Sequence, residues 1–241
     1  MNTIKIHAGS TRLIAHRGLS KIEPENTAAA FIAAGNRSYY GMENDIYRTA
    51  DGRFAIHHDK SLLRMSGEDL TVPECSLAQL QSIVLFDENG TKARPELRVP
   101  SLEEYLNICR RYEKHSVIEL KSNFTAEEIA RILELVRTHW SLEHVTFISF
   151  HYENLALVRA QLPEQSVQFL FSEITDEILA RVTADRVDVD VYHRALTKEA
   201  IDTFHAAGIS VNAWTVDDPE EAERLCGWGI DFITTNILET Y

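Results

Sequence analysis

Residues 41–59, GMENDIYRTADGRFAIHHD, contain the most informative structural pattern of the sequence. The stretch opens as a buried strand in which Glu43 and Asp45 share one face, because side chains two apart in a strand point the same way. Asp51-Gly52 follows as a hairpin signal, and Phe54-Ala55-Ile56 supplies a return strand. We therefore expect a strand whose antiparallel partner projects from the main sheet.

On both sides of this stretch, short apolar runs alternate with amphipathic runs. The apolar runs predict eight strands, at Leu13–His16, Gly41–Tyr47, Ser116–Lys121, Val145–Phe150, Val167–Phe171, Arg186–Tyr192, Ile209–Thr215 and Ile230–Asn236. The amphipathic runs predict helices at Asn26–Ala34, Ser101–Lys114, Thr125–Trp140, Tyr152–Gln161, Thr175–Val182, Lys198–Ala207 and Pro219–Cys226. Such alternation implies βαβ units and a parallel sheet. Eight strands in this length favour closure into a TIM-type (β/α)8 barrel, which typically takes about 250 residues.

Two segments depart from regular alternation. Residues 59–100 form a long connection with a short amphipathic piece near Ser76–Val84, and we expect a small insertion after strand two that covers one end of the barrel. Only Leu238–Tyr241 follow the last strand, so the eighth outer helix is expected to be truncated. Length alone would allow two small domains, but the pattern predicts one domain over residues 1–241.

Several helix boundaries have local signals. Ser101 and Thr125 each stand three residues before a glutamate, which predicts capping boxes. Gly208 occupies the position expected of a glycine just after a helix, and Pro219 suits a first turn.

Composition excludes several classes of protein. The net charge of −13 leaves no basic face for a nucleic acid and disfavours docking on anionic lipid. No run approaches the about 18 apolar residues of a membrane span. Met1–Ser10 shows no signal-peptide pattern, so a cytoplasmic location is expected. The three cysteines form no C-x-x-C pair, and neither GxGxxG nor GxxxxGK[ST] occurs.

Ionisable side chains gather at the predicted carboxyl ends of the strands, where barrel enzymes place their chemistry. Glu43 and Asp45 share a face on strand two, and Glu119 and Lys121 do so on strand three. Three converging carboxylates repel one another unless a cation lies among them, and oxygen ligands favour Mg²⁺ or Ca²⁺. The alternative is a set of ion-paired rim residues.

Two histidines stand at strand ends from which they can face each other across such a metal. His16 ends strand one and His58 ends the hairpin partner, a pairing suited to general acid–base catalysis. His57 should face away from the site. Arg17 suits a bidentate contact with phosphate. Asp188 and Asp190 share a face on strand six, either as a polar layer of the barrel or in support of the site.

These motifs resemble those of the glycerophosphodiester phosphodiesterases, in particular a cytoplasmic, bacterial-like branch. The resemblance covers nearly the whole chain and is most specific in the first sixty residues. Its motifs are His16-Arg17-Gly18, Pro24-Glu25-Asn26-Thr27, Ala30-Phe31, Glu43-x-Asp45, Thr49-x-Asp51-Gly52, His58-Asp59, Leu62-x-Arg64, Val99–Glu104, Ile118–Lys121, Ser149-Phe150 and Ala213–Val216. One departure is Asn236, where an aspartate is expected in a Thr-Asp pair; we expect this residue to lie apart from the groups that contact metal and substrate.

The resemblance implies a TIM barrel and a role for each candidate residue. His16 and His58 are the implied acid–base pair, with His16 provisionally the base. The implied ligands of one divalent ion, Mg²⁺ or Ca²⁺, are Glu43, Asp45 and Glu119. Arg17 and Lys121 are implied to hold the phosphate, and Trp214 to line the glycerol or alcohol pocket.

The implied reaction is metal-dependent hydrolysis of a small-molecule glycerophosphodiester to sn-glycerol 3-phosphate and an alcohol. Attack by water and attack by the glycerol 2-hydroxyl through a cyclic phosphate both remain open. The alternatives are a lyase that stops at the cyclic phosphate and a barrel that binds diesters without catalysis. The sequence leaves open the alcohol head group, the choice between Mg²⁺ and Ca²⁺, and the oligomeric state.

Overall fold

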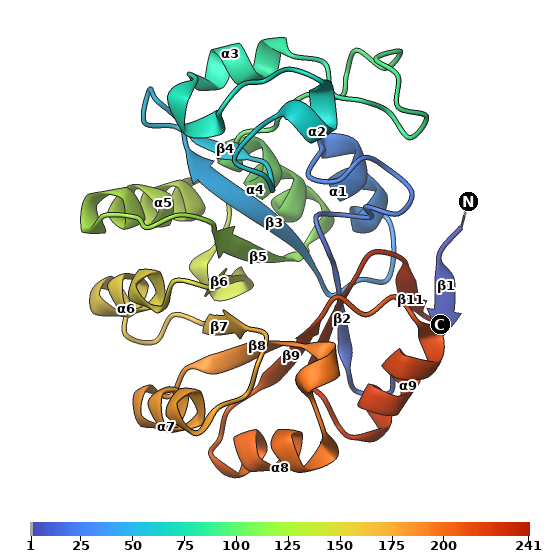
Figure 1. Ribbon diagram of the computed structural model, residues 1–241, viewed down its shortest axis with the longest axis vertical. Coiled ribbons are helices and arrows are strands. Elements are labelled where there is room, and N and C mark those ends of the chain that lie inside the picture. Colours follow the sequence, from blue (N-terminus) through green and yellow to red (C-terminus); the bar gives the residue numbers. More distant parts are fainter. Residues whose placement is uncertain (1) are drawn as a thin grey trace.

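The computed structural model describes residues 2–241, and its central feature is a closed barrel of parallel strands surrounded by helices (Figure 1). The barrel strands are β2 (Arg12–Ala15), β3 (Gly41–Arg48), β5 (His115–Leu120), β6 (Val145–Ser149), β7 (Val167–Phe171), β8 (Asp188–Tyr192), β9 (Val211–Trp214) and β10 (Phe232–Thr235). They pair in the order β2-β10-β9-β8-β7-β6-β5-β3, and pairing of β2 with β3 closes the ring. The predicted TIM barrel is confirmed.

The outer helices follow the strands in the predicted sequence. They are α1 (Ala28–Gly35), α4 (Leu102–Tyr112), α5 (Ala126–His139), α6 (Tyr152–Gln161), α7 (Asp176–Asp185), α8 (Lys198–Ala206) and α9 (Pro219–Gly227). Every predicted strand and helix is present with its ends shifted by at most two residues, except that α7 continues to Asp185. No helix within residues 2–241 combines the length and apolar character needed to cross a membrane.

The hairpin and the insertion lie beside β3. Strand β4 (Phe54–Ile56) pairs antiparallel with β3, as Asp51-Gly52 predicts. The insertion contains two short helices, α2 (Leu63–Ser66) and α3 (Leu77–Ser82), the latter starting in a capping box at Ser76. These elements have a small apolar core of their own that includes Leu62, Leu80 and Val99.

Most predicted helix boundaries are confirmed. Thr125 begins α5 in a complete capping box, Gly208 follows α8 with a φ of +73°, and Pro219 is the first residue of α9. Ser101 caps α4 by accepting the backbone N–H of Glu104, but the return bond of the predicted capping box does not form.

Within residues 2–241 no eighth outer helix follows β10, where a truncated one was expected. In its place, β11 (Leu238–Thr240) pairs in parallel with β1 (Ile4–Ile6) as a separate two-stranded sheet.

Besides the small core of the insertion, apolar side chains pack in two regions of the barrel. A continuous core lies between the strands and the outer helices and includes Phe31, Tyr105 and Phe147. A smaller cluster fills the barrel interior, formed by Ile14, Val117, Ile148 and Leu170. Because this cluster occupies the middle of the barrel, the polar side chains farther along the strands gather above it, at the carboxyl ends of the strands.

Candidate active site

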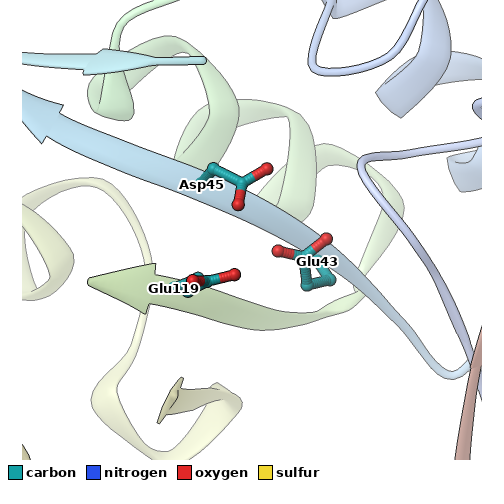
Figure 2. A group of neighbouring side chains, drawn as sticks. All are labelled: Glu43, Asp45 and Glu119. Carbon is teal, nitrogen blue, oxygen red and sulfur yellow. The ribbon is translucent and has the colours of Figure 1, made fainter. Parts of the chain in front are cut away.

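Three carboxylates converge at the carboxyl end of the barrel. Glu43 and Asp45 extend from β3, and Glu119 extends from β5, where it is the register partner of Asp45. Figure 2 shows the three side chains pointing toward one another. All three are buried, and one carboxylate oxygen from each lies within 4.8 Å of the others. The two-residue period of β3 and its pairing with β5 therefore place three acids in one cluster.

Two cations contact this cluster. Lys121 Nζ lies 2.9 Å from Glu119 Oε1 and 3.3 Å from Asp45 Oδ1. Arg17 Nε lies 3.4 Å from Asp45 Oδ2, and the Arg17 backbone N–H donates to Glu43 Oε2 at 2.8 Å. The carboxylates are thus partly neutralised by neighbours, as the ion-paired alternative requires, but two cations do not balance three acids.

The pKa values show how the remaining charge is distributed. Burial and the neighbouring carboxylates raise the pKa of Glu119 to about 8 and that of Glu43 well above its usual range. Burial also opposes ionisation of Asp45, but Lys121 and Arg17 outweigh it and lower the pKa of that carboxyl. The cluster therefore holds protons near neutral pH when no metal is bound.

The chemistry of these donors fits a divalent cation. They supply only hard oxygen ligands, which suit Mg²⁺ and Ca²⁺. Asp45 Oδ1 is buried, and its one close cationic neighbour is Lys121 Nζ at 3.3 Å, which also contacts Glu119, so this oxygen can still ligate a metal ion. The cluster can thus hold one divalent ion.

His16 is oriented by a chain of hydrogen bonds. Its Nδ1 lies 2.8 Å from Asn236 Oδ1, and Asn236 Nδ2 donates to Asp217 Oδ2 at 2.7 Å. Because an ionised carboxylate only accepts, the amide must turn its oxygen toward His16, so Nδ1 bears the proton and Nε2 has a free lone pair. Burial, and secondly Arg17, lower the pKa of His16 to about 4 and keep the ring neutral.

This contact gives Asn236 more importance than the sequence indicated. Asn236 does not line the cavity, but it touches His16 directly, and its Oδ1 also accepts the hydroxyl of Ser20 at 2.7 Å. The departure from aspartate therefore falls on the group that sets the His16 tautomer.

His58 has a different partner. Its Nδ1 lies 2.7 Å from Asp59 Oδ1, while Arg64 Nε donates to Asp59 Oδ2 at 2.6 Å. Burial, together with the positive charges of Arg17 and Lys121, lowers the pKa of His58, while the charge of Asp45 and the hydrogen bond to Asp59 oppose that effect. A carboxylate on Nδ1 stabilises the protonated ring better than the amide on His16 does. His57 turns away as predicted, with its Nδ1 bonded to the backbone oxygen of Asp59.

The turn after β2 requires an unusual backbone. Arg17 has a φ of +54°, and Gly18 has a φ of +75° with the backbone carbon of Ala30 only 2.6 Å from where a Cβ would stand. Only glycine fits so close an approach. The turn directs the Arg17 side chain back over the carboxylates, where Glu25 also accepts from it at 2.9 Å.

A cavity opens among these side chains. It is lined by His16, Arg17, Glu43, His58, Glu119, Lys121, Ile148, Phe150, Leu170, Asp190, Trp214 and Thr234. Seven of the eight candidate residues line it, and Asp45 lies behind them, held by Asn26 Nδ2 at 2.7 Å. A larger surface hollow near Leu142 and Ser166 has no comparable group of ionisable side chains, so the barrel mouth is the candidate site.

Trp214 lines one side of the cavity, and its aromatic neighbours there were not predicted from the sequence. Trp214 packs edge-on against Phe150, with ring centroids 5.6 Å apart, and lies 5.4 Å from Tyr192. Its indole N–H donates to the backbone oxygen of Asp190. Asp217 was also missed, because nothing in its sequence context links it to His16.

The chain matches the sequence model of a known family. The sequence model of the "Glycerophosphoryl diester phosphodiesterase family" matches residues 16–240. A protein of Caldanaerobacter subterraneus named glycerophosphodiester phosphodiesterase is 27% identical over 95% of this chain and 96% of its own length. One of Bacillus subtilis with the same name is 29% identical over 95% of this chain and 84% of its own.

Comparison with solved structures leads to the same group of proteins. A phosphodiesterase of Oleispira antarctica, in complex with the product sn-glycerol-3-phosphate, superposes with a TM-score of 0.87 at 27% identity, covering 93% of this chain and 92% of that one.

Proposed function

Because the chain belongs to the glycerophosphoryl diester phosphodiesterase family and is thus a phosphoric diester hydrolase, we propose that it hydrolyses glycerophosphodiesters to sn-glycerol 3-phosphate and an alcohol with the help of a divalent metal. One observation carries the proposal: two histidines with differently bonded Nδ1 atoms line the same cavity as a cluster of carboxylates. The product bound by the Oleispira relative supports the substrate class.

Glu43, Asp45 and Glu119 would hold Mg²⁺ or Ca²⁺, which would neutralise charge that develops on the phosphate oxygens. Arg17 and Lys121 lie against the same carboxylates. Their positive charges would bind the non-bridging oxygens of the diester and help to orient phosphorus. Trp214 would pack against the carbon skeleton of the substrate.

His16 is the proposed general base. Its neutral ring, with Nε2 unprotonated, can accept the proton of the attacking hydroxyl as the new O–P bond forms. His58 is the proposed general acid, because Asp59 stabilises its protonated form. It gives the Nε2 proton to the departing alcohol oxygen as that P–O bond breaks.

The attacking hydroxyl belongs either to water or to the glycerol C2 carbon. In the second case a cyclic phosphate forms first, and water then opens it with the roles of the two histidines reversed. The proton balance is the same in both routes, so both use the same residues.

The test is release of glycerol 3-phosphate from glycerophosphocholine and glycerophosphoethanolamine, with Mg²⁺, Ca²⁺ or EDTA, for the wild type and His16→Ala. We expect metal-dependent release that EDTA and the substitution both abolish. Release that persists in EDTA would refute the metal requirement. A cyclic phosphate as the final product in phosphorus NMR would identify a lyase instead.

A further inference from the structure

Asp190 lies on the wall of the cavity opposite the carboxylate cluster. In the closed strand order, β8 is four strands from β3 in either direction, so Asp190 faces Glu43 and Asp45 across the barrel. It is 1% exposed and lines the cavity between the register partners Leu170 on β7 and Asn212 on β9. Any molecule that fills the cavity therefore has the proposed metal ligands on one side and Asp190 on the other.

The carboxyl of Asp190 lacks a protein partner for one of its oxygens. Oδ1 is buried and accepts no hydrogen bond in the described chain. Its neighbour Asn212 is already bonded to Gln168 and Thr234. Burying a carboxyl oxygen without a partner costs stability, and a leucine of the same shape would avoid that cost. The presence of a carboxyl at position 190 is thus better explained by contact with a molecule that enters the cavity than by the packing of the barrel.

Charge decides which end of a glycerophosphodiester can reach Asp190. The phosphate is anionic and is drawn to Arg17 and Lys121 on the opposite wall. The carboxyl of Asp190 offers the phosphate no positive charge, whereas a hydroxyl can both donate to and accept from a carboxyl. Ile148 and Leu170, which line the cavity next to Asp190, suit the carbon chain between the two ends.

We propose that Asp190 recognises the terminal hydroxyl of the glycerol moiety and so determines specificity for glycerol phosphodiesters. The terminal hydroxyl is chosen because the C2 hydroxyl lies one carbon nearer the phosphate, on the side of His16. This inference rests on the proposed function, since it assumes that the glycerol phosphate half of the substrate fills the cavity.

The test compares two ligands with the intact protein in the presence of Mg²⁺: sn-glycerol 3-phosphate and propane-1,2-diol 1-phosphate, which lacks only the terminal hydroxyl. Calorimetry gives both dissociation constants for the wild type, Asp190→Leu and Asp190→Asn. We expect the wild type to prefer glycerol phosphate by about 10- to 100-fold. Asp190→Leu should reduce this preference to about twofold or less by weakening only the glycerol phosphate, and Asp190→Asn, which still hydrogen-bonds, should retain most of it.

Asp188→Asn is the matched control. Asp188 is an acid on the same strand, but it accepts the backbone N–H of Ser210 at 2.8 Å and lines a separate hollow with Arg12 and His115. This substitution should leave the preference of the wild type unchanged. Thermal unfolding should show Asp190→Leu to be at least as stable as the wild type, because it removes a buried unpaired oxygen.

The possible results of these experiments distinguish a failure of this inference from a failure of the proposed function on which it rests. A wild type that releases glycerol 3-phosphate but binds both ligands equally would overturn the role of Asp190 alone. So would equal weakening of both ligands in Asp190→Leu, which would indicate an effect on phosphate or metal. A folded wild type that cleaves no glycerophosphodiester would overturn both proposals.

Discussion

Metal binding should strengthen steeply between pH 6 and pH 8. The pKa of Glu119 is raised to about 8, so in the metal-free protein this carboxyl is protonated over most of that range. A metal binds only the ionised form and must displace the proton. Raising the pH removes the proton beforehand, so affinity rises with pH and approaches its limit above about 8.

The size of the effect follows from that pKa. About 1% of Glu119 is ionised at pH 6 and about half at pH 8, so the apparent dissociation constant should fall by about 50-fold from this residue alone. Glu43, whose pKa is also raised, acts in the same direction.

Calorimetric titration of Mg²⁺ and Ca²⁺ at pH 6, 7 and 8, in buffers of different ionisation enthalpy, measures both the affinity and the protons released. Glu119→Gln is the control: it should bind the metal more weakly but with a shallower dependence on pH. Equal affinity at pH 6 and pH 8, or binding without proton release, would refute the reasoning.

Three further predictions concern the groups around the metal cluster. His16→Ala and His58→Ala should each lower kcat by about 10²- to 10⁴-fold while metal affinity measured by calorimetry stays unchanged. Asn236→Leu should lower kcat by about 10- to 100-fold because the His16 tautomer is no longer held, and it should also lower Tm because Ser20 and Asp217 lose a partner; a wild-type rate would contradict that role. Gly18→Ala should destabilise the protein by about 1–3 kcal/mol, seen as a lower Tm, because its Cβ would meet the backbone of Ala30.

The sequence correctly predicted that the three carboxylates converge, because their positions depend on local rules. Glu43 and Asp45 are two residues apart on one strand, and Glu119 lies on the strand that pairs with it. The two-residue period and the parallel connection suffice to bring these three together. The same two-residue period correctly predicted that the side chain of His57 points away from that of His58.

The side of the cavity that holds Asp190, and the contact of His16 with Asn236, could not be predicted in the same way. Whether Asp190 or Asp188 reaches the cavity depends on the stagger of strands around the closed barrel, which no local pattern reveals. The contact between Asn236 and His16 joins the last barrel strand to the first, across 220 positions of sequence. Such contacts exist only once the ring has closed.

The small sheet of β1 and β11 brings the two ends of the described chain together (Figure 1). Thr3 Oγ1 donates to Glu239 at 2.6 Å, and Glu239 in turn accepts from Ser38, in the loop that enters β3 at the end of the barrel away from the cavity. A short peptide could therefore join the ends, and the chain could be reopened at the exposed turn around Gly90. The protein should thus tolerate circular permutation, and a second domain fused at either end would leave the cavity mouth free.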